Sequence, residues 1–144
     1  MEKPTIIIDT REQHFYAFNS ESAHSIRRKL EAGDYSLLGF ESRVAVERKS
    51  LVDFVSTVLR GRRRFANELK KLALMEASCV VVEADLSDVI HGRYRSDAHP
   101  NSIIGAALSI QLNYGVPVHF CSDRQCARAF VEAYLLRFYK KANS

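Results

Sequence analysis

The sequence predicts a three-layer α/β fold with a central mixed sheet. Residues 78–83 form a continuous apolar run, which is typical of a strand covered on both faces. The second half of the chain alternates strand and helix patterns, as parallel strands with right-handed crossovers do. Residues 33–38 and 44–47 are interpreted as two strands joined by a turn at Gly39. A hairpin is antiparallel, and it makes the expected sheet mixed.

Length and composition favour one domain over residues 1–144. The chain has 144 residues, 47% hydrophobic and 26% charged, without internal repeats or low-complexity segments. It contains neither a leader pattern nor an apolar run of about 18 residues, so we expect no membrane partner and a cytoplasmic location. Cysteines 79, 121 and 126 lack metal-site spacing, which argues against a zinc or disulfide framework. The net charge of +4 and pI near 9.1 fit a polyanionic partner.

The beginning of the chain is expected to contain a buried strand and a short helix. Residues 5–8 are an apolar run that ends in the carboxylate of Asp9. Residues 20–30 are interpreted as a short helix, with Ser20 or Ser22 as its N-cap.

Later elements follow from apolar spacing and end signals. Phe65, Leu69 and Leu72 recur at three- and four-residue intervals, which predicts an amphipathic helix. Gly115 is suited to a left-handed cap at the end of another helix. In chain order we expect helices at 50–59 and 63–76, the strand at 78–83, a helix at 101–114, a strand at 116–121 and a helix at 123–140.

The hairpin carries residues that suggest a metal site. Asp34 lies at the start of its first strand, and Glu47-x-Lys49 lies on the partner strand. Pairing of the two strands brings two carboxylates and an ammonium to one edge of the sheet. Hard oxygen ligands suit Mg²⁺ or Mn²⁺, which can orient a water and offset charge on a phosphate. Lys49 is then placed to polarise that water or to hold a phosphate oxygen.

Two further acids and an arginine follow the first strand. Asp9, Arg11 and Glu12 lie directly after residues 5–8. Functional residues group at the carboxyl ends of strands in α/β sheets, so we expect these side chains near the hairpin site.

The blocks Asp-Thr-Arg-Glu (9–12), Gly-Asp-Tyr (33–35) and Glu-Arg-Lys followed by Asp53 (47–53) occur in that order. They resemble the three signature blocks of the XPF family of structure-specific nucleases. The similarity continues through Arg64-Phe65, the strand at 78–83 and residues 114–118. It therefore covers nearly the whole chain.

This resemblance implies a restriction-endonuclease-like fold that uses Mg²⁺ or Mn²⁺. It also implies cleavage of DNA at branch points or junctions, in repair or recombination. Carried over by position, the carboxylate cluster is Asp9, Glu12, Asp34 and Glu47. Lys49 becomes the catalytic lysine, and Arg11 and Arg64 become phosphate contacts. Arg48 is expected to place its backbone carbonyl near the metal and its side chain on phosphate or in a structural role.

The chain looks most similar to standalone nuclease-domain proteins of bacteria and phages, which predicts a nucleoid-associated or phage-encoded protein. Longer family members carry a tandem helix-hairpin-helix domain, for which this sequence has no counterpart. We therefore expect DNA as a partner, and we consider a homodimer and a separate DNA-targeting protein as further hypotheses. The apolar positions Ile103, Leu112, Tyr134 and Phe138 are the surface we expect for a dimer.

Two charged features have a functional and a structural interpretation. Arg62, Arg63 and Arg64 follow the hairpin and its helix, so we favour contact with the DNA backbone over a merely solvated face. Asp53 fits a capping box with Ser50 and equally fits support of the active site.

The leading hypothesis is an active endonuclease. The alternative is a catalytically silent DNA-binding module or partner subunit, which is less favoured because all five key polar residues are retained. A nucleotide-binding protein is disfavoured, since the sequence has neither G-x-G-x-x-G nor a Walker-type lysine loop.

Overall fold

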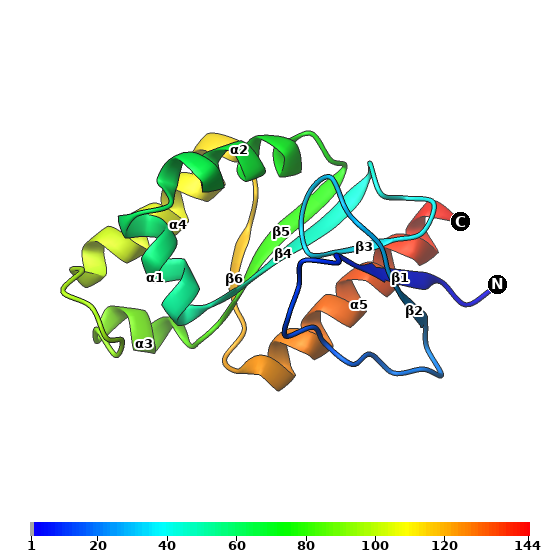
Figure 1. The fold of residues 1–144 in the computed structure, drawn as a ribbon, viewed down its shortest axis with the longest axis horizontal. Coiled ribbons are helices and arrows are strands. Elements are labelled where there is room, and N and C mark those ends of the chain that lie inside the picture. The colour runs from blue at the N-terminus through cyan, green and yellow to red at the C-terminus, as the bar shows by residue number, and fades with distance from the viewer. Residues whose placement is uncertain (1) are drawn as a thin grey trace.

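The computed structural model describes residues 2–144, which form a six-stranded mixed sheet with helices on both faces (Figure 1). The strands are β1 (Thr5–Ile8), β2 (His24–Arg27), β3 (Tyr35–Leu37), β4 (Val44–Ser50), β5 (Ala77–Glu83) and β6 (Val118–Phe120). The helices are α1 (Leu51–Leu59), α2 (Arg62–Ala73), α3 (Leu86–Ile90), α4 (Pro100–Tyr114) and α5 (Arg124–Ala142). The strand order is β2-β1-β3-β4-β5-β6, so the expected α/β class is confirmed.

Side-chain alternation along the central strands builds two apolar cores. Ala45, Val80 and Val82 pack with α1, α2 and α4, whereas Val46 and Val81 pack with α5. Figure 1 shows α5 on one side of the sheet and α1, α2 and α4 on the other. The sheet is therefore the middle layer of three.

The topology matches the pattern expected from the sequence in the middle and second half. Strands β4, β5 and β6 are parallel, and β3 and β4 form the antiparallel hairpin with Tyr35 opposite Val46. Ser50 caps α1 and Asp123 caps α5 through side chains that accept backbone N–H groups. Gly115 ends α4 with a φ of 68°, the left-handed cap predicted for it.

The helix expected at residues 20–30 is wrong, because residues 24–27 are strand β2. Asn19 produces a single turn, in which its carbonyl accepts the N–H groups of Ser22 and Ala23. The chain then pairs in parallel with the free edge of β1, from His24 beside Thr5 onwards. Pairing with a neighbouring strand thus overrides a weak local preference for helix.

The prediction that Ile103 belongs to a dimer surface is also wrong. Its side chain is fully buried against the α4 face of the sheet, whereas Leu112 on the same helix is 83% exposed. Tyr134 and Phe138 are half-buried beside the α5 core. Within residues 2–144, no helix combines the length and apolarity that a membrane crossing requires.

Candidate active site

The backbone brings three predicted acids onto adjacent strands. The Asp9 N–H donates to the Asp34 carbonyl at 2.9 Å, and the Asp34 N–H donates to the Val46 carbonyl at 2.8 Å. Asp34 therefore lies beside Glu47, which follows Val46. Gly33 permits this approach, because a Cβ there would lie 3.0 Å from that of Ala45, and its φ of +76° disfavours any other residue. The spacing between the sequence blocks thus becomes spatial proximity.

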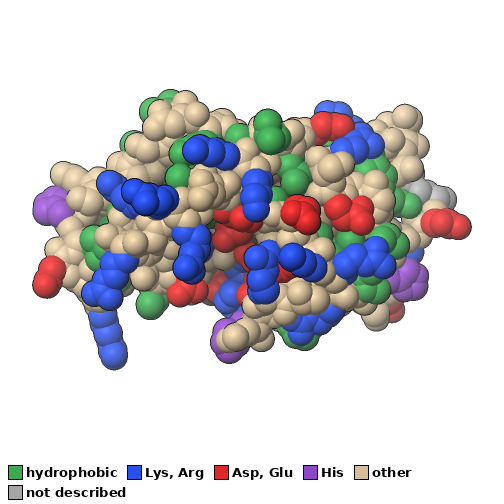
Figure 2. All heavy atoms as spheres, turned by 45° about the horizontal axis from the view of Figure 1, so that its top comes forward, with side chains coloured by type: hydrophobic (Ala, Val, Ile, Leu, Met, Phe, Trp, Pro, Cys, Tyr) green, Lys and Arg blue, Asp and Glu red, His purple; other side chains and the backbone are tan. Residues whose placement is uncertain are grey.

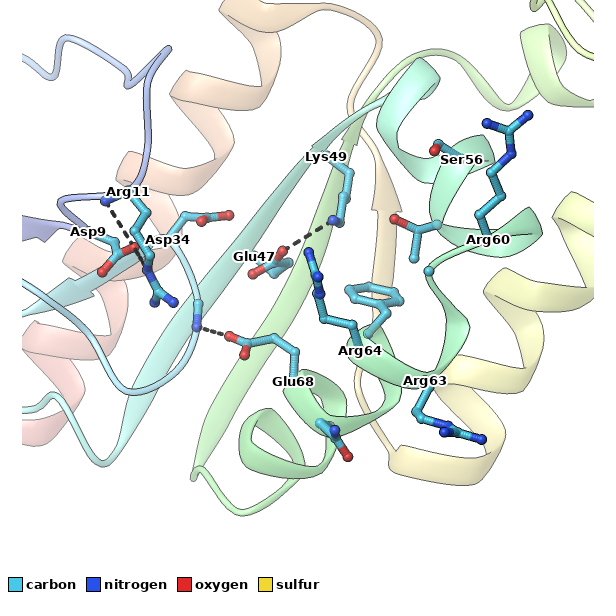
Figure 3. A pocket seen from close by; sticks show the side chains of 15 residues that line it. Asp9, Arg11, Asp34, Glu47, Lys49, Ser56, Arg60, Arg63, Arg64 and Glu68 are labelled. Carbon is cyan, nitrogen blue, oxygen red and sulfur yellow. Dashed lines mark hydrogen bonds and ion pairs between the residues drawn. The ribbon is translucent and has the colours of Figure 1, made fainter.

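Asp9, Asp34, Glu47 and Lys49 share one cleft of about 1130 Å³ between the β3–β4 edge and helices α1 and α2 (Figure 3). Its remaining lining residues are Arg11, Gly33, Ser56, Thr57, Arg60, Gly61, Arg63, Arg64, Phe65, Asn67 and Glu68. Figure 2 shows acidic side chains at the centre of this face with Lys and Arg side chains around them. An acidic floor with a basic rim suits a phosphate ester that approaches a cation site.

Two of the acids are held where a negative charge is unfavourable. Burial raises the pKa of Asp34 to about 7, although the Arg48 N–H donates to its Oδ2 at 2.7 Å. Burial, followed by the charge of Asp34, raises the pKa of Glu47 well above its usual range. Lys49 opposes this shift, with Nζ 3.6 Å from Glu47 Oε2. Ionising both carboxyl groups would therefore leave more negative charge here than the neighbouring cations neutralise.

Lys49 is directed into the cleft by two contacts. Besides its ion pair with Glu47, its Nζ lies 4.9 Å from the centroid of the Phe65 ring on α2. An aromatic face and a carboxylate together hold the ammonium group in one position. Lys49 is therefore placed to meet a phosphate oxygen or a water near Glu47.

Asp9 has a different environment from Asp34 and Glu47. Its Oδ2 lies 2.8 Å from Arg11 Nε, and its Oδ1 accepts the Leu30 N–H at 2.8 Å. Burial of Asp9 opposes ionisation, but these hydrogen bonds outweigh it and lower the pKa of the carboxyl group. The exposed guanidinium of Arg11 thus stands at the cleft beside a carboxylate that is ionised at neutral pH.

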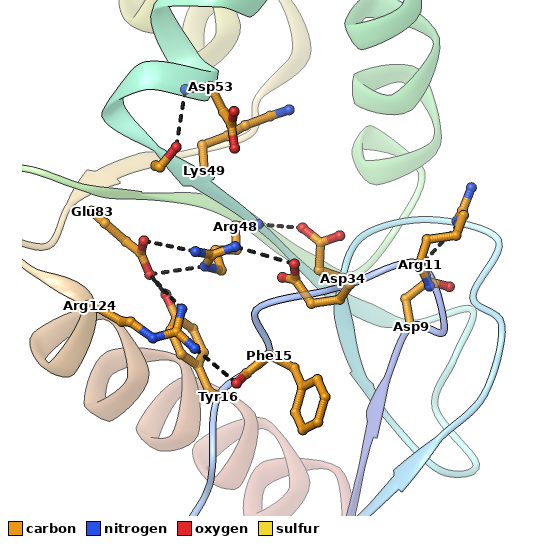
Figure 4. Close-up of polar contacts among 12 residues, drawn as sticks. Asp9, Arg11, Phe15, Tyr16, Asp34, Arg48, Lys49, Asp53, Glu83 and Arg124 are labelled. Atoms are coloured by element: carbon orange, nitrogen blue, oxygen red, sulfur yellow. Dashed lines mark hydrogen bonds and ion pairs between the residues drawn. The ribbon is translucent and has the colours of Figure 1, made fainter. Parts of the chain in front are cut away.

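The Arg48 side chain lies on the α5 side of the sheet, outside the cleft lining (Figure 4). Glu12 is not part of the lining either, but its charge adds to burial in raising the pKa of Asp34 and of Glu47, so it lies near both. Arg48 Nη1 is 3.3 Å from Glu12 Oε1, and its Nε and Nη2 donate to Glu83. The Arg48 side chain is only 11% exposed. A DNA contact by this side chain stays a prediction, whereas its contacts with Glu12 and Glu83 are present in the structure.

The arginine run divides between two surfaces. Arg63 and Arg64 line the cleft, whereas Arg62 lines a groove between α2 and α4. In Figure 3, Arg64 reaches back toward Glu47 and Lys49. Their expected DNA contacts stay predictions, but the structure separates Arg62 from the other two.

Asp53 takes part in the cap of α1 through its backbone. Its N–H donates to Ser50 Oγ at 3.1 Å, and its side chain is exposed outside the cleft lining. The half of the predicted capping box in which Ser50 accepts the Asp53 N–H is therefore confirmed.

Sequence reasoning missed Glu68 and Glu83. Glu68 Oε1 accepts the Gly33 N–H at 2.6 Å and so joins α2 to the loop before Asp34. A signal for it existed, since Glu68 is the sole acid in the basic helix α2, one turn after Arg64. Glu83 ends β5, where it pairs with Ser50, the residue after Lys49, so its position at the end of a strand was a signal too.

The acids do not form a closed cage. Among residues 2–144, no group of three or more His, Cys, Asp or Glu side chains lies close enough to hold a metal ion. The described arrangement is instead an acidic pair, Asp34 and Glu47, with Asp9 and Glu12 each turned to an arginine.

A mixed sheet with carboxylates at the ends of adjacent central strands, beside a basic cleft, is the restriction-endonuclease-like class of fold. Within this class the chain belongs to the ERCC4 domain family, whose model matches residues 8–134. The resemblance to the XPF nucleases is thereby confirmed.

Solved structures agree with this assignment. XPF from Aeropyrum pernix matches with a TM-score of 0.74 and 26% identity over 94% of this chain and 61% of that chain. Its complex with DNA matches with a TM-score of 0.73 and 26% identity over 97% and 66%. The present chain thus spans less than two thirds of either structure.

A curated relative is much longer. A protein of Methanocaldococcus jannaschii, MJ1505, named as a proposed ATP-dependent RNA helicase, is 34% identical over 120 residues. The match covers 83% of this chain but 14% of that relative. The shared region is therefore a small part of the helicase-named protein.

Proposed function

We propose that this protein is a divalent-metal-dependent endonuclease that hydrolyses phosphodiester bonds in branched or junction DNA during repair or recombination. The observation that carries the proposal is an acidic pair, half-buried Asp34 and buried Glu47, on the floor of a cleft with an arginine rim, in a chain of the ERCC4 domain family. Support for DNA as substrate comes from the solved DNA complex of its Aeropyrum pernix relative. Helicase activity is not proposed, because the match covers 14% of the helicase-named relative.

The donor set fits Mg²⁺ or Mn²⁺ in its chemistry. The charge of half-buried Asp34 opposes ionisation of buried Glu47, and Glu12 Oε2 is buried without a hydrogen-bond partner. Excess oxygen donors of this kind favour a hard divalent cation. Asp34 and Glu47 would hold it, with Asp9 and Glu12 as further oxygen donors. A bound ion supplies an activated water and offsets charge on the phosphate.

The basic residues of the cleft have separate tasks in this proposal. Lys49 holds a phosphate oxygen or orients a water beside Glu47. Arg11, Arg63 and Arg64 bind flanking phosphates, which fixes the DNA backbone across the acidic floor without reading its sequence.

Purified protein should be incubated with linear, flapped, forked and four-way DNA in Mg²⁺, Mn²⁺ or EDTA. We expect cleavage of branched substrates with either ion and none in EDTA. Equal cleavage in EDTA would contradict the metal requirement, and equal cleavage of linear duplex would contradict selectivity for branches.

One observation favours a second candidate, a catalytically silent DNA-binding module or partner subunit. The acids of residues 2–144 do not close around a common point, and Arg11 already pairs with Asp9. Such a protein would bind the same DNA panel and cleave none of it in either metal, which separates the two functions.

A further inference from the structure

A buried ionic network lies on the α5 side of the sheet, behind the acidic cleft. The proposed function gives it no role in cleavage or DNA binding. Glu83, at the end of β5, accepts hydrogen bonds from both Arg48 Nε and Arg48 Nη2 at 3.0 Å. The two side chains are 9% and 11% exposed. A two-point bond between planar groups fixes the orientation of the guanidinium as well as its position.

Arg48, fixed in this way, contacts two of the predicted acids. Its Nη1 lies 3.3 Å from Glu12 Oε1, and its backbone N–H donates to Asp34 Oδ2 at 2.7 Å. The other Glu12 oxygen, Oε2, is buried and has no hydrogen-bond partner. One oxygen of Glu12 is thus anchored, while the second is left as a buried acceptor without a partner, which is costly unless it meets a cation.

Two residues outside the sequence motifs hold Glu83 in turn. The Tyr16 hydroxyl donates to Glu83 Oε2 at 2.5 Å, and Arg124 Nη1 of α5 lies 3.7 Å from the same oxygen (Figure 4). The Arg124 guanidinium also stands 4.9 Å from the centroid of the Tyr16 ring. Tyr16, Arg48 and Arg124 together therefore hold the Glu83 carboxylate in place.

The alternative task for Arg48, a direct phosphate contact, conflicts with this geometry. Its guanidinium is almost covered and already has two carboxylate partners. Burial opposes its positive charge, but Glu83 and Glu12 outweigh that effect and raise the pKa of Arg48. Its charge is consequently matched within the protein.

We propose that Glu83 is a positioning residue: through Arg48 it holds Glu12 so that Oε2 is available as an oxygen donor to the divalent ion of the proposed nuclease. This inference rests on the proposed function for its purpose. Partners that orient metal ligands typically contribute 10- to 100-fold in metal affinity or activity. Glu83 has that kind of effect although it lies outside the cleft lining.

The test uses the full chain with Glu83→Gln, which keeps the shape but loses the charge and one acceptor. Mn²⁺ affinity is measured by calorimetry without DNA, and kcat, KM and DNA affinity in EDTA are measured separately. We expect Mn²⁺ affinity and kcat to fall by about 10- to 100-fold, with KM and metal-free DNA affinity unchanged.

Glu76→Gln is the matched control, because Glu76 also forms a two-point pair with an arginine, Arg43, but on the exposed surface. It should leave all four quantities unchanged. Unchanged Mn²⁺ affinity in Glu83→Gln would overturn the inference. So would a loss of metal-free DNA affinity with a reduced salt dependence, which would assign Arg48 to phosphate.

If circular dichroism shows that Glu83→Gln is unfolded, Tyr16→Phe carries the test. It removes one hydrogen bond to Glu83 and keeps the Arg48–Glu83 pair. A several-fold loss of Mn²⁺ affinity supports the inference, and no loss overturns it. Wild-type protein that binds Mn²⁺ but cleaves no DNA would defeat the nuclease proposal, while the Mn²⁺ comparison would still decide the role of Glu83.

Discussion

Asp34 and Glu47 are the carboxyl groups of residues 2–144 for which a raised pKa is resolved. Burial and the charges of Glu12 and Asp9 raise the pKa of Asp34, and burial and the charge of Asp34 raise the pKa of Glu47. Exposed carboxylates elsewhere in the chain behave in the opposite way, as Glu76 does beside Arg43, where the ion pair lowers its pKa. Arrangements that oppose ionisation are found at functional sites, where a cation or a proton restores the balance.

Protonation of Asp34 gives the first prediction. Its pKa is about 7 in the folded protein against 3.8 in the unfolded chain, so the folded state binds more protons between these values. Stability without metal should therefore be fully present below about pH 4 and fall as the pH rises toward 7, by on the order of 2–4 kcal/mol. Urea unfolding in EDTA at pH 5 and 8 measures this fall.

Asp34→Asn is the matched variant for that measurement. The amide does not titrate, so the loss of stability from pH 5 to 8 should be smaller than in the wild type. Identical pH dependence of the two proteins would show that the Asp34 carboxyl group is not held in its neutral form.

Residues that belong to the sequence motifs were placed correctly. Asp9, Asp34, Glu47 and Lys49 line one cleft as expected from their order along the chain. The sequence did not predict that Glu12 pairs with Arg48, because the position of Arg48 depends on Glu83, 35 residues further along the chain. Local blocks cannot report a partner so distant in sequence.

Helix α2 supplies both the rim of the cleft and part of the core. Phe65, Leu69 and Leu72 are buried, as their spacing predicted, and the opposite side is basic. The sequence predicts the same role for Arg62, Arg63 and Arg64. Because an α-helix rotates by about 100° per residue, their side chains lie on different surfaces. Arg62 consequently lines the groove beside α4.

This division predicts unequal effects on DNA binding. Replacing Arg63 and Arg64 with Gln should weaken binding and reduce the slope of log K against log salt by roughly one unit per lost phosphate contact. Arg62→Gln, the control on the same helix turn, should change the slope less. Fluorescence anisotropy across a salt series measures both, and equal slopes for wild type and the double variant would favour a merely solvated face.

Strand β2 shows why one element was mispredicted. Its four residues, His24–Arg27, are mostly exposed, so apolar alternation gave no strand signal. Its conformation comes from the free edge of β1, to which it is hydrogen-bonded. The buried strands and amphipathic helices carry their own patterns, and for this reason they were predicted well.

At the scale of the whole molecule, the two faces of the sheet have different consequences. The α1–α2 side carries the cleft, and the α5 side carries a shallow groove of about 360 Å³, whose lining is mostly apolar and includes Ala133, Tyr134 and Phe138. Self-association through two-fold symmetry is the commonest way to cover such a surface. Burial of Ile103 moves the expected interface from α4 toward α5.

We therefore expect a homodimer at tens of micromolar or on DNA, and Ala133→Arg should convert it to a monomer. Ala133 is exposed within the groove, so the new charge would be buried without a partner in the dimer. Gln125→Arg, at an exposed position of the same helix outside the groove, is the control. Light scattering that shows a monomeric wild type, with no second copy recruited on DNA, would contradict the dimer.

The central claim is that the acidic cleft is a working nuclease site, and Glu47→Ala tests it most directly. Cleavage of forked DNA in Mn²⁺ by the wild type and by folded Glu47→Ala is the decisive comparison, with Glu31→Ala, an exposed acid outside the cleft, as control. We expect the rate to fall by more than about 100-fold in Glu47→Ala, beyond the usual effect of a supporting residue, with the melting temperature preserved. Cleavage by folded Glu47→Ala at the wild-type rate would contradict the account.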